Sequence, residues 1–465
     1  MTGLKYFFTN YGDVYSGYEY PDTSMGKFRI IIQGTKKKDY EALTLEEKTL
    51  EKISEHGWAL NPNVIKKIED ENFNPPKWQL RGDSWSGYYD RKVMFIFGAG
   101  ASANCVYGSE KKEFNQDPLR PPLGPALFDK RFKAYFNKYK GVKQSLHFLQ
   151  DDNANVEEFF EHEWKNISLE NNQAVLSRHI NIQYYLQEVL KDVSSFIIDE
   201  YSKNLYSALA NKLQKIYSAS IVDNERIHSS KRFAFVSFNQ DTILETFLQD
   251  QFNHWFSNID DYANINESPF CVFKPHGSWN WGWEFPEREK FNNKTADWLF
   301  ENKISLFQLY YELLGNYVDM IDWANTFGTE FSIHRHNLGK FTIDKSQLKI
   351  IDASRINDFY PGLLLPYRDK DEFIMPLKHF YTMQSYFSYL ETLVIVGWKG
   401  NEEAFNRQLL QHSKNLKKII IADPNHEIVE ENLKDLFLKH NITPIIYKDF
   451  EDFVLNGVEK ELNES

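Results

Sequence analysis

The chain has 465 residues, of which 42% are hydrophobic and 16% aromatic, so it is too long for one ordinary domain and too aromatic for a disordered chain. Its formal net charge of −12 argues against broad binding to nucleic acid, because an acidic field repels phosphates. Its two cysteines exclude a disulfide scaffold and a four-cysteine zinc module. With no evident signal peptide and no run of about 20 apolar residues, we expect a cytoplasmic protein without a membrane partner.

Residues 1–90 have a character of their own. Runs rich in aromatic and β-branched residues predict three strands, at 5–9, 14–20 and 27–33. Two helices are predicted next, near 45–56 and 63–70. Pro75 and Pro76 then mark a boundary. We therefore expect a small α+β N-terminal segment that serves as an accessory or interaction element.

From Lys92 onward, short apolar runs alternate with helical patterns. The apolar runs predict buried strands at 93–97, 232–238, 269–274, 393–397, 418–422 and 442–447. The helical patterns lie at 156–165, 172–217, 402–411 and 427–439. Because strands and helices alternate, the sequence predicts a doubly wound, Rossmann-like α/β domain with a parallel sheet over about 91–450.

Two insertions interrupt the predicted α/β domain. The first, over about 125–230, is helical, and the second, over about 282–360, is aromatic and contains a helix near 304–323. Residues 451–465 are interpreted as a C-terminal tail. The aromatic residues of 1–90 and of the second insertion are candidates for packing against the α/β domain or for protein interfaces.

A glycine-rich turn follows the first apolar run directly. Gly98, Gly100 and Ser102 give the spacing Gly-x-Gly-x-Ser, which lacks the third glycine of the dehydrogenase fingerprint. Glycines let the backbone approach a phosphate, and a following helix N-terminus offers free N–H groups. The pattern predicts a dinucleotide site, and the alternative is a tight turn in a fold that binds no nucleotide.

Polar side chains follow the next two apolar runs. Asn239 and Asp241 come after the second, and His276 comes after the third. Open α/β sheets bind ligands at the carboxyl ends of their strands, so these side chains are candidates for chemistry. A neutral imidazole can accept a proton near pH 7. The alternatives are an ordinary helix cap for Asn239 and Asp241 and a structural histidine at position 276.

Two later strands end at Gly397 and at Asp423. Taken in chain order, all these motifs resemble the sirtuin-like domains of bacterial proteins, in the branch often attached to antiphage defence. The resemblance covers about 91–450 without the insertions and implies that NAD is bound as a substrate. It implies that Asn239 and Asp241 are catalytic and together handle the nicotinamide end of NAD and either the ribose or the water that attacks it. It also implies that His276 is the general base.

The resemblance also implies a set of cofactor-binding positions. The first four would cradle the pyrophosphate, the next two belong to a loop that covers the cofactor, and the last two lie at the adenosine end. These positions are Gly98, Ala99, Gly100, Ser102, Pro122, Leu123, Gly397 and Asp423.

Two features depart from the family. Deacetylating sirtuins usually hold a structural zinc with four cysteines, which this chain cannot build, so plain NAD hydrolysis is favoured and no metal is expected. His334 and His336 have no further ligands at convincing spacing. Family members often carry a small hydroxyl residue after the later glycine, whereas this chain has Trp398 and Lys399.

We therefore expect an NAD glycohydrolase that releases nicotinamide and ADP-ribose, acting as a toxic effector in antiphage defence by abortive infection. One alternative is an NAD-dependent protein deacylase or ADP-ribosyltransferase. Another is a module that senses NAD or ADP-ribose without cleaving it. The resemblance implies a homo-oligomer, or a partner such as a translocating ATPase or an Argonaute-like protein. Any nucleic acid would be sensed through that partner and not bound directly.

Overall fold

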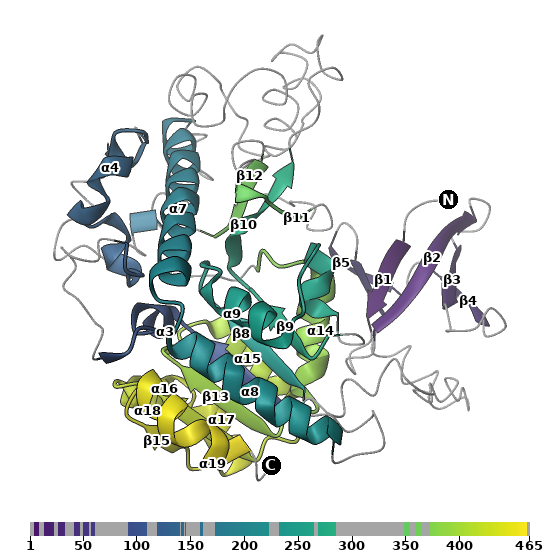
Figure 1. Ribbon diagram of the computed structural model, residues 1–465. Helices are drawn as coiled ribbons and strands as arrows, with labels where there is room; N and C mark the ends of the chain where they lie inside the picture. The colour runs from purple at the N-terminus through teal and green to yellow at the C-terminus, as the bar shows by residue number, and fades with distance from the viewer. Residues whose placement is uncertain are drawn as a thin grey trace. The chain divides into compact units, whose positions relative to one another are not determined.

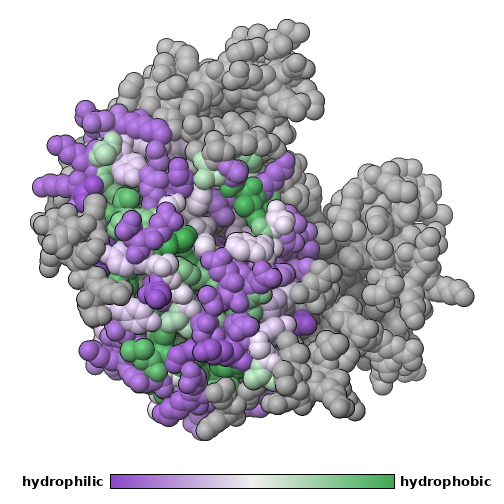
Figure 2. Space-filling view, in the orientation of Figure 1, coloured by the Kyte–Doolittle hydropathy of each residue, from purple (hydrophilic) through white to green (hydrophobic). Residues whose placement is uncertain are grey.

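The computed structural model describes most of the predicted α/β domain and the strands of the N-terminal segment. The described residues are 4–8, 14–22, 27–32, 41–46, 50–54, 57–60, 92–108, 119–139, 141–143, 145, 159–160, 173–222, 232–264, 268–284, 348–353, 359–364 and 373–462. Two compact units divide the chain, Met1–Trp85 with Tyr381–Ser385 and Ser86–Phe380 with Tyr386–Ser465. In these described ranges no helix is long and apolar enough to cross a bilayer. Hydrophilic and hydrophobic side chains are interspersed on the face shown in Figure 2.

The first unit holds a six-stranded sheet in the order β4-β3-β2-β1-β6-β5. Its strands are β1 (Leu4–Phe8), β2 (Val14–Asp22), β3 (Lys27–Ile32), β4 (Glu41–Glu46), β5 (Leu50–Ser54) and β6 (Gly57–Leu60). The three strands predicted from sequence are therefore confirmed. The helix predicted at 45–56 is wrong, because β4 pairs along its length with β3 and β5 pairs with β6. The helix predicted at 63–70 lies outside the described residues.

The second unit is built on a six-stranded parallel sheet, which confirms the doubly wound α/β fold (Figure 1). Its strands are β7 (Val93–Phe97), β8 (Phe233–Ser237), β9 (Phe270–Phe273), β13 (Thr392–Val396), β14 (Lys418–Ala422) and β15 (Ile445–Tyr447). They lie in the order β15-β14-β13-β7-β8-β9, and every neighbouring pair is parallel. Numbered within the sheet, this is the Rossmann order 3-2-1-4-5-6.

The central strands are buried along their whole length. Every residue of β7, β8, β9 and β13 is buried, as a parallel sheet covered on both faces requires. Aromatic side chains fill much of this core, and the rings of Phe95 and Phe235 stack with centroids 5.2 Å apart. These strands are continuous apolar runs in the sequence because helices cover both faces of the sheet.

The helices confirm the predicted α/β alternation, with different boundaries. The longer ones are α7 (Gln173–Glu200), α8 (Leu205–Val222), α9 (Ile243–Phe252), α14 (Leu377–Phe387), α15 (Glu403–His412), α16 (His426–Asn432) and α17 (Lys434–His440). The single helix predicted at 172–217 is two helices, α7 and α8, and the one predicted at 427–439 is also two. Short turns of helix precede them: α3 (Ala99–Ala103), η3 (Gly124–Phe128), η4 (Lys130–Phe132) and α4 (Lys133–Phe136).

The predicted C-terminal tail is wrong, because residues 451–462 are folded. They form α18 (Phe450–Asp452), η10 (Phe453–Gly457) and α19 (Val458–Leu462). The Phe453 side chain is fully buried and its ring centroid lies 6.5 Å from that of Phe95 on β7. The α/β domain thus continues to Leu462.

The described ends of the aromatic insertion form a small antiparallel sheet. It consists of β10 (Gly277–Glu284), β11 (Lys349–Ile350) and β12 (Phe359–Leu363), with β10 in the middle. A hydrogen bond joins helix α7 to this sheet, in which the Tyr184 hydroxyl donates to the Phe359 carbonyl at 2.8 Å. The predicted helices at 304–323 and 156–165 are not among the fully described ranges, and His334 and His336 also lie outside them.

Candidate functional site

The ends of β7 and β13 meet at the centre of the parallel sheet. The chain leaves β7 through Gly98 and β13 through Gly397. The Gly98 N–H donates to the Val396 carbonyl and the Gly100 N–H to the Gly397 carbonyl, both at 3.1 Å. A Cβ on Gly98 would lie 2.5 Å from the Gly397 oxygen, and Gly397 has a φ of +59°. Both glycines are therefore required by a close backbone contact at the point where the strand order reverses.

This contact uses backbone N–H groups of the glycine-rich turn that the sequence analysis expected to bind a phosphate. Helix α3 has only five residues, and the amides of Gly98 and Gly100 already donate to the end of β13. These two glycines join the central strand ends and do not present free N–H groups to a phosphate. A pyrophosphate would have to be bound by other groups of the cavity.

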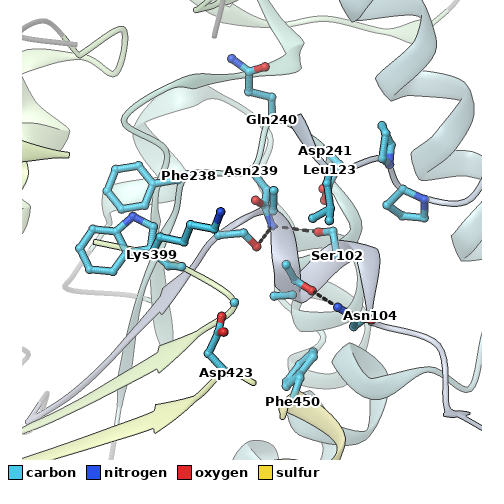
Figure 3. A pocket seen from close by; sticks show the side chains of 18 of the residues that line it. Ser102, Asn104, Leu123, Phe238, Asn239, Gln240, Asp241, Lys399, Asp423 and Phe450 are labelled. Carbon is cyan, nitrogen blue, oxygen red and sulfur yellow. Dashed lines mark hydrogen bonds between the residues drawn. The ribbon is translucent and has the colours of Figure 1, made fainter. Parts of the chain in front are cut away.

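A cavity of about 650 Å³ lies at the carboxyl edge of the sheet (Figure 3), a size typical of small-molecule and cofactor sites. Every residue that the sequence predicts for the site lines it: Gly98, Ala99, Gly100, Ser102, Pro122, Leu123, Asn239, Asp241, His276, Gly397 and Asp423. In Figure 3, Asp423 lies toward the opposite end of the pocket from Gln240. The fold thus brings residues that are far apart in sequence into one place.

The Asn239 amide is fixed by the glycine-rich turn. Its Nδ2 donates to the Gly98 carbonyl and to the Ser102 Oγ, both at 2.9 Å, as Figure 3 shows. A carbonyl oxygen can only accept, so the amide group must face it with its nitrogen. Both amide hydrogens are used, and Oδ1 is the group of Asn239 that remains for a ligand.

Asp241 contacts the start of α9 as well as the cavity. Its Oδ1 accepts from the Ile243 N–H, the first of α9, at 3.2 Å, and the residue also lines the cavity. Burial raises the pKa of Asp241, and nearby Lys274 and a hydrogen bond from Ser102 oppose this effect. The net effect is a raised pKa, because burial is the largest of these influences.

A buried ion pair beneath Asp241 was missed by the sequence reading. Lys274 follows β9, and its Nζ donates to the Asp241 carbonyl oxygen and to the Glu245 carboxylate. Both side chains are essentially inaccessible to solvent. The available signal was a glutamate on the apolar face of α9, because charged residues are almost never fully buried unless they are paired.

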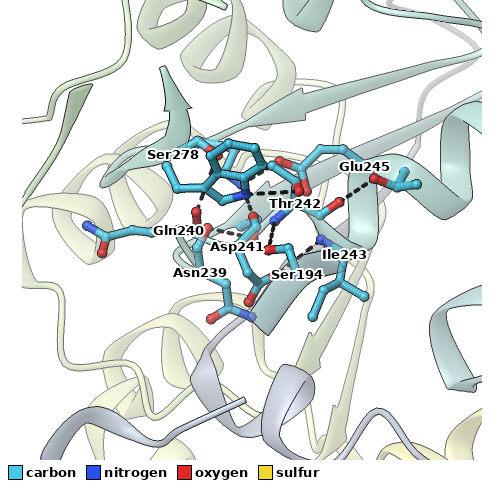
Figure 4. A network of polar contacts seen from close by, with 12 residues as sticks. Ser194, Asn239, Gln240, Asp241, Thr242, Ile243, Glu245 and Ser278 are labelled. Carbon is cyan, nitrogen blue, oxygen red and sulfur yellow. Dashed lines mark hydrogen bonds and ion pairs between the residues drawn. The ribbon is translucent and has the colours of Figure 1, made fainter. Parts of the chain in front are cut away.

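Helix α7 of the first insertion and strand β10 hold the segment that carries Asn239 and Asp241 (Figure 4). The Ser194 hydroxyl on α7 accepts from the Thr242 N–H at 3.2 Å. The Trp279 indole on β10 donates to the Thr242 hydroxyl at 3.1 Å, and the Trp279 N–H donates to the Gln240 carbonyl at 2.9 Å. The segment is therefore anchored from two sides.

His276 is buried beside the same segment, with 4% of its surface exposed. Its carbonyl accepts from the Gln240 side chain and from the Leu364 N–H, both at 3.0 Å. Its ring lies against Phe238, with centroids 5.0 Å apart. The backbone of His276 is thus fixed while its imidazole lines the cavity.

An aromatic wall closes one side of the cavity. Trp398 stacks on Phe238 with ring centroids 5.2 Å apart and an angle of 6° between the planes. Its indole N–H donates to the Glu402 carboxylate at 2.5 Å. Phe405 meets both rings edge to face. Trp398 is therefore part of the wall, where a planar group of a ligand could pack.

The far end of the cavity is lined by Asp423 and by residues at the start of α18, of which Glu451 falls in the predicted tail. Asp423 accepts from the Asn425 N–H at 2.7 Å, and burial raises its pKa while Lys399 opposes the shift. Asp449, Phe450 and Glu451 also line the cavity.

Among the described residues, no group of three or more His, Cys, Asp or Glu side chains is placed to hold a metal ion. Neither protein-family models nor curated protein sequences match this chain.

Proposed function

We propose that this chain is a sirtuin-like NAD glycohydrolase, which splits NAD into nicotinamide and ADP-ribose. One observation carries the proposal: residues chosen from separate sequence motifs, from Gly98 to Asp423, line a single cavity. That cavity lies beside the reversal of strand order, where doubly wound sheets bind nucleotides.

The polar groups of the cavity suit the cleavage of an N-glycosidic bond. Nicotinamide leaves with the electron pair of its bond to the ribose, and the ribose carbon becomes oxocarbenium-like. Water adds to that carbon and gives up a proton. In this scheme Asp241 binds the carboxamide, the Asn239 Oδ1 accepts a hydrogen bond from the water, and His276 takes the proton.

A module that binds NAD or ADP-ribose without cleaving it is the second candidate. It is favoured by Trp398, whose indole occupies the wall where the family often has a small residue, and by the engaged amides of Gly98 and Gly100. A protein deacylase or ADP-ribosyltransferase would need an acceptor site in addition.

The proposed biological role is a toxic effector of antiphage defence. It rests on the resemblance to bacterial sirtuin-like domains, as do the proposed homo-oligomer and the proposed partner, a translocating ATPase or an Argonaute-like protein. In such a system an NAD-cleaving chain is restrained until its partner signals infection.

Chromatography of reaction products tests the proposal and separates its rivals. Purified protein is incubated with NAD, with and without an acetylated peptide, while calorimetry measures NAD binding. Equal amounts of nicotinamide and ADP-ribose without peptide support the glycohydrolase. Nicotinamide release only with peptide indicates a deacylase, and binding without release indicates a sensor. A protein that neither binds nor cleaves NAD contradicts the proposal.

A further inference from the structure

The Ser102 hydroxyl lies between the two polar residues proposed to act on the nicotinamide end. It accepts from the Asn239 Nδ2 at 2.9 Å and lies 3.1 Å from the Tyr206 hydroxyl. It also lowers the pKa of Asp241, against the effect of burial. Ser102 and Tyr206 are both buried, at 3% and 1% exposure, so water competes little for these bonds.

The hydrogens of this group can be assigned by their chemistry. A serine hydroxyl has one hydrogen and two lone pairs. One lone pair of Ser102 accepts from Asn239, and its hydrogen makes the strongest bond when it goes to the Asp241 carboxylate, because charge-assisted bonds are strong. The Tyr206 hydroxyl then donates to the second lone pair. Every hydrogen-bonding position of Ser102 is used in this arrangement.

We propose that Tyr206 and Ser102 are positioning residues, which hold Asn239 and Asp241 in their working orientation. The proposal rests on the proposed function and deepens it. It gives Ser102 a role that replaces the pyrophosphate contact implied by the resemblance. It also gives the helical insertion a role, because Tyr206 belongs to α8.

Tyr206 is held firmly and at a distance from any substrate. Its ring lies 5.5 Å from that of Phe97 on β7 and 5.2 Å from that of Phe450, measured between centroids. It is not among the described residues that line the cavity. Removal of its hydroxyl therefore acts on catalysis only through Ser102, and the two ring contacts keep the side chain in place.

The charge on Asp241 depends on several neighbours. Lys274 and Glu245 lie beneath it, Tyr206 approaches from α8, and His276 lines the same cavity. Burial raises the pKa of Asp241, whereas Lys274 and Ser102 lower it. Loss of the Ser102 hydroxyl therefore raises the pKa of Asp241 further.

The first test compares Y206F with Y217F in the full chain. Tyr217 lies on the same helix and its ring contacts Phe252, so Y217F makes the same chemical change away from Ser102. We expect Y206F to lower kcat for nicotinamide release about 3- to 10-fold, the range for one hydrogen bond, while KM for NAD stays within about twofold. Y217F should leave both constants unchanged. Equal kinetics for the two variants would overturn the role of Tyr206.

The second test needs no activity, so it stays informative if the proposed function fails. Urea unfolding is measured from pH 4 to pH 7 for wild type, S102A, D241N and the double variant. A carboxyl whose pKa is raised on folding loses its stabilising contribution as the pH rises through that window. The free energy of unfolding of S102A should therefore fall further below that of wild type as the pH rises. The difference in free energy of unfolding between the double variant and D241N should not change with pH. Differences that both stay constant with pH would refute the link between Ser102 and Asp241.

Discussion

Gly98 and Gly397 lie against each other at the ends of the two central strands. A Cβ on Gly98 would come within 2.5 Å of the Gly397 carbonyl oxygen, and the Gly100 N–H donates to that same oxygen. Because this contact forms the floor of the cavity, the geometry of the site depends on the absence of side chains here.

The substitution Gly397→Ala should lower the free energy of unfolding by about 3 kcal/mol or more. The new Cβ would overlap the Ala101 nitrogen at a positive φ, and neither backbone can move without parting β7 from β13. Urea unfolding measures the loss. Gly108→Ala is the control, because its Cβ meets only the flexible end of Glu451 at 3.2 Å. Similar stability for both variants would show that the contact is not tight.

Asn239→Asp should lower the stability and the turnover of the protein far more than its small change in shape suggests. Aspartate cannot donate to the Gly98 carbonyl or to Ser102, and a carboxylate oxygen would face the carbonyl oxygen. We expect a loss of about 1 to 3 kcal/mol in the free energy of unfolding, with loss of turnover. Asn211→Asp, on the exposed face of α8, should change stability by less than about 0.5 kcal/mol. If Asn239→Asp matches that control, the assigned amide orientation is wrong.

The strands along the chain and the polar residues at their ends could be predicted because they depend on local patterns. The apolar run at Val93–Phe97 is long enough for a strand and too short for a helix. It is followed by Gly98, whose close contact with Gly397 leaves no room for a side chain. The same reasoning located Asn239 and His276 at strand ends. It failed at 45–56, where helix-forming Leu, Glu and Lys are outweighed by pairing with a neighbouring strand.

The polar network around the site could not be predicted, because its members are far apart in sequence. Ser102 and Asn239 are 137 residues apart, and Ser102 and Tyr206 are 104 apart. Lys274 follows an apolar strand, and nothing local pairs it with Glu245. Contacts of this kind depend on how α8 and α9 lie on the sheet, which periodicity does not specify.

Lys274→Met should destabilise the protein by about 3 to 5 kcal/mol, because it leaves the Glu245 carboxylate buried without its cation. The double variant Lys274→Met/Glu245→Met should recover much of that loss, since apolar side chains of similar size can replace a buried pair. A double-mutant cycle of urea unfolding gives the coupling energy. Additive losses would mean that the two residues act independently.

The protein should lose stability between pH 6.5 and pH 4 through His379. Burial lowers the pKa of this histidine to about 4, although Asp260 opposes the shift. The unfolded chain takes up the proton near pH 6.5 and the folded chain does not, so the contribution is complete above pH 6.5 and falls by about 3 kcal/mol toward pH 4. His379→Leu should flatten the pH dependence of the unfolding free energy in that window. The same slope in both proteins would rule out this source of acid sensitivity.

The most direct measurement is nicotinamide release from NAD by the wild-type protein and by His276→Ala and Asn239→Ala. Circular dichroism first establishes that all three proteins have the same folded content. The wild type should release nicotinamide and ADP-ribose in equal amounts, and each variant should be slower by about 100- to 10,000-fold, the usual cost of losing a positioned general base or its partner. A wild-type protein that leaves NAD intact, or a His276→Ala variant with nearly full activity, would contradict the proposed glycohydrolase.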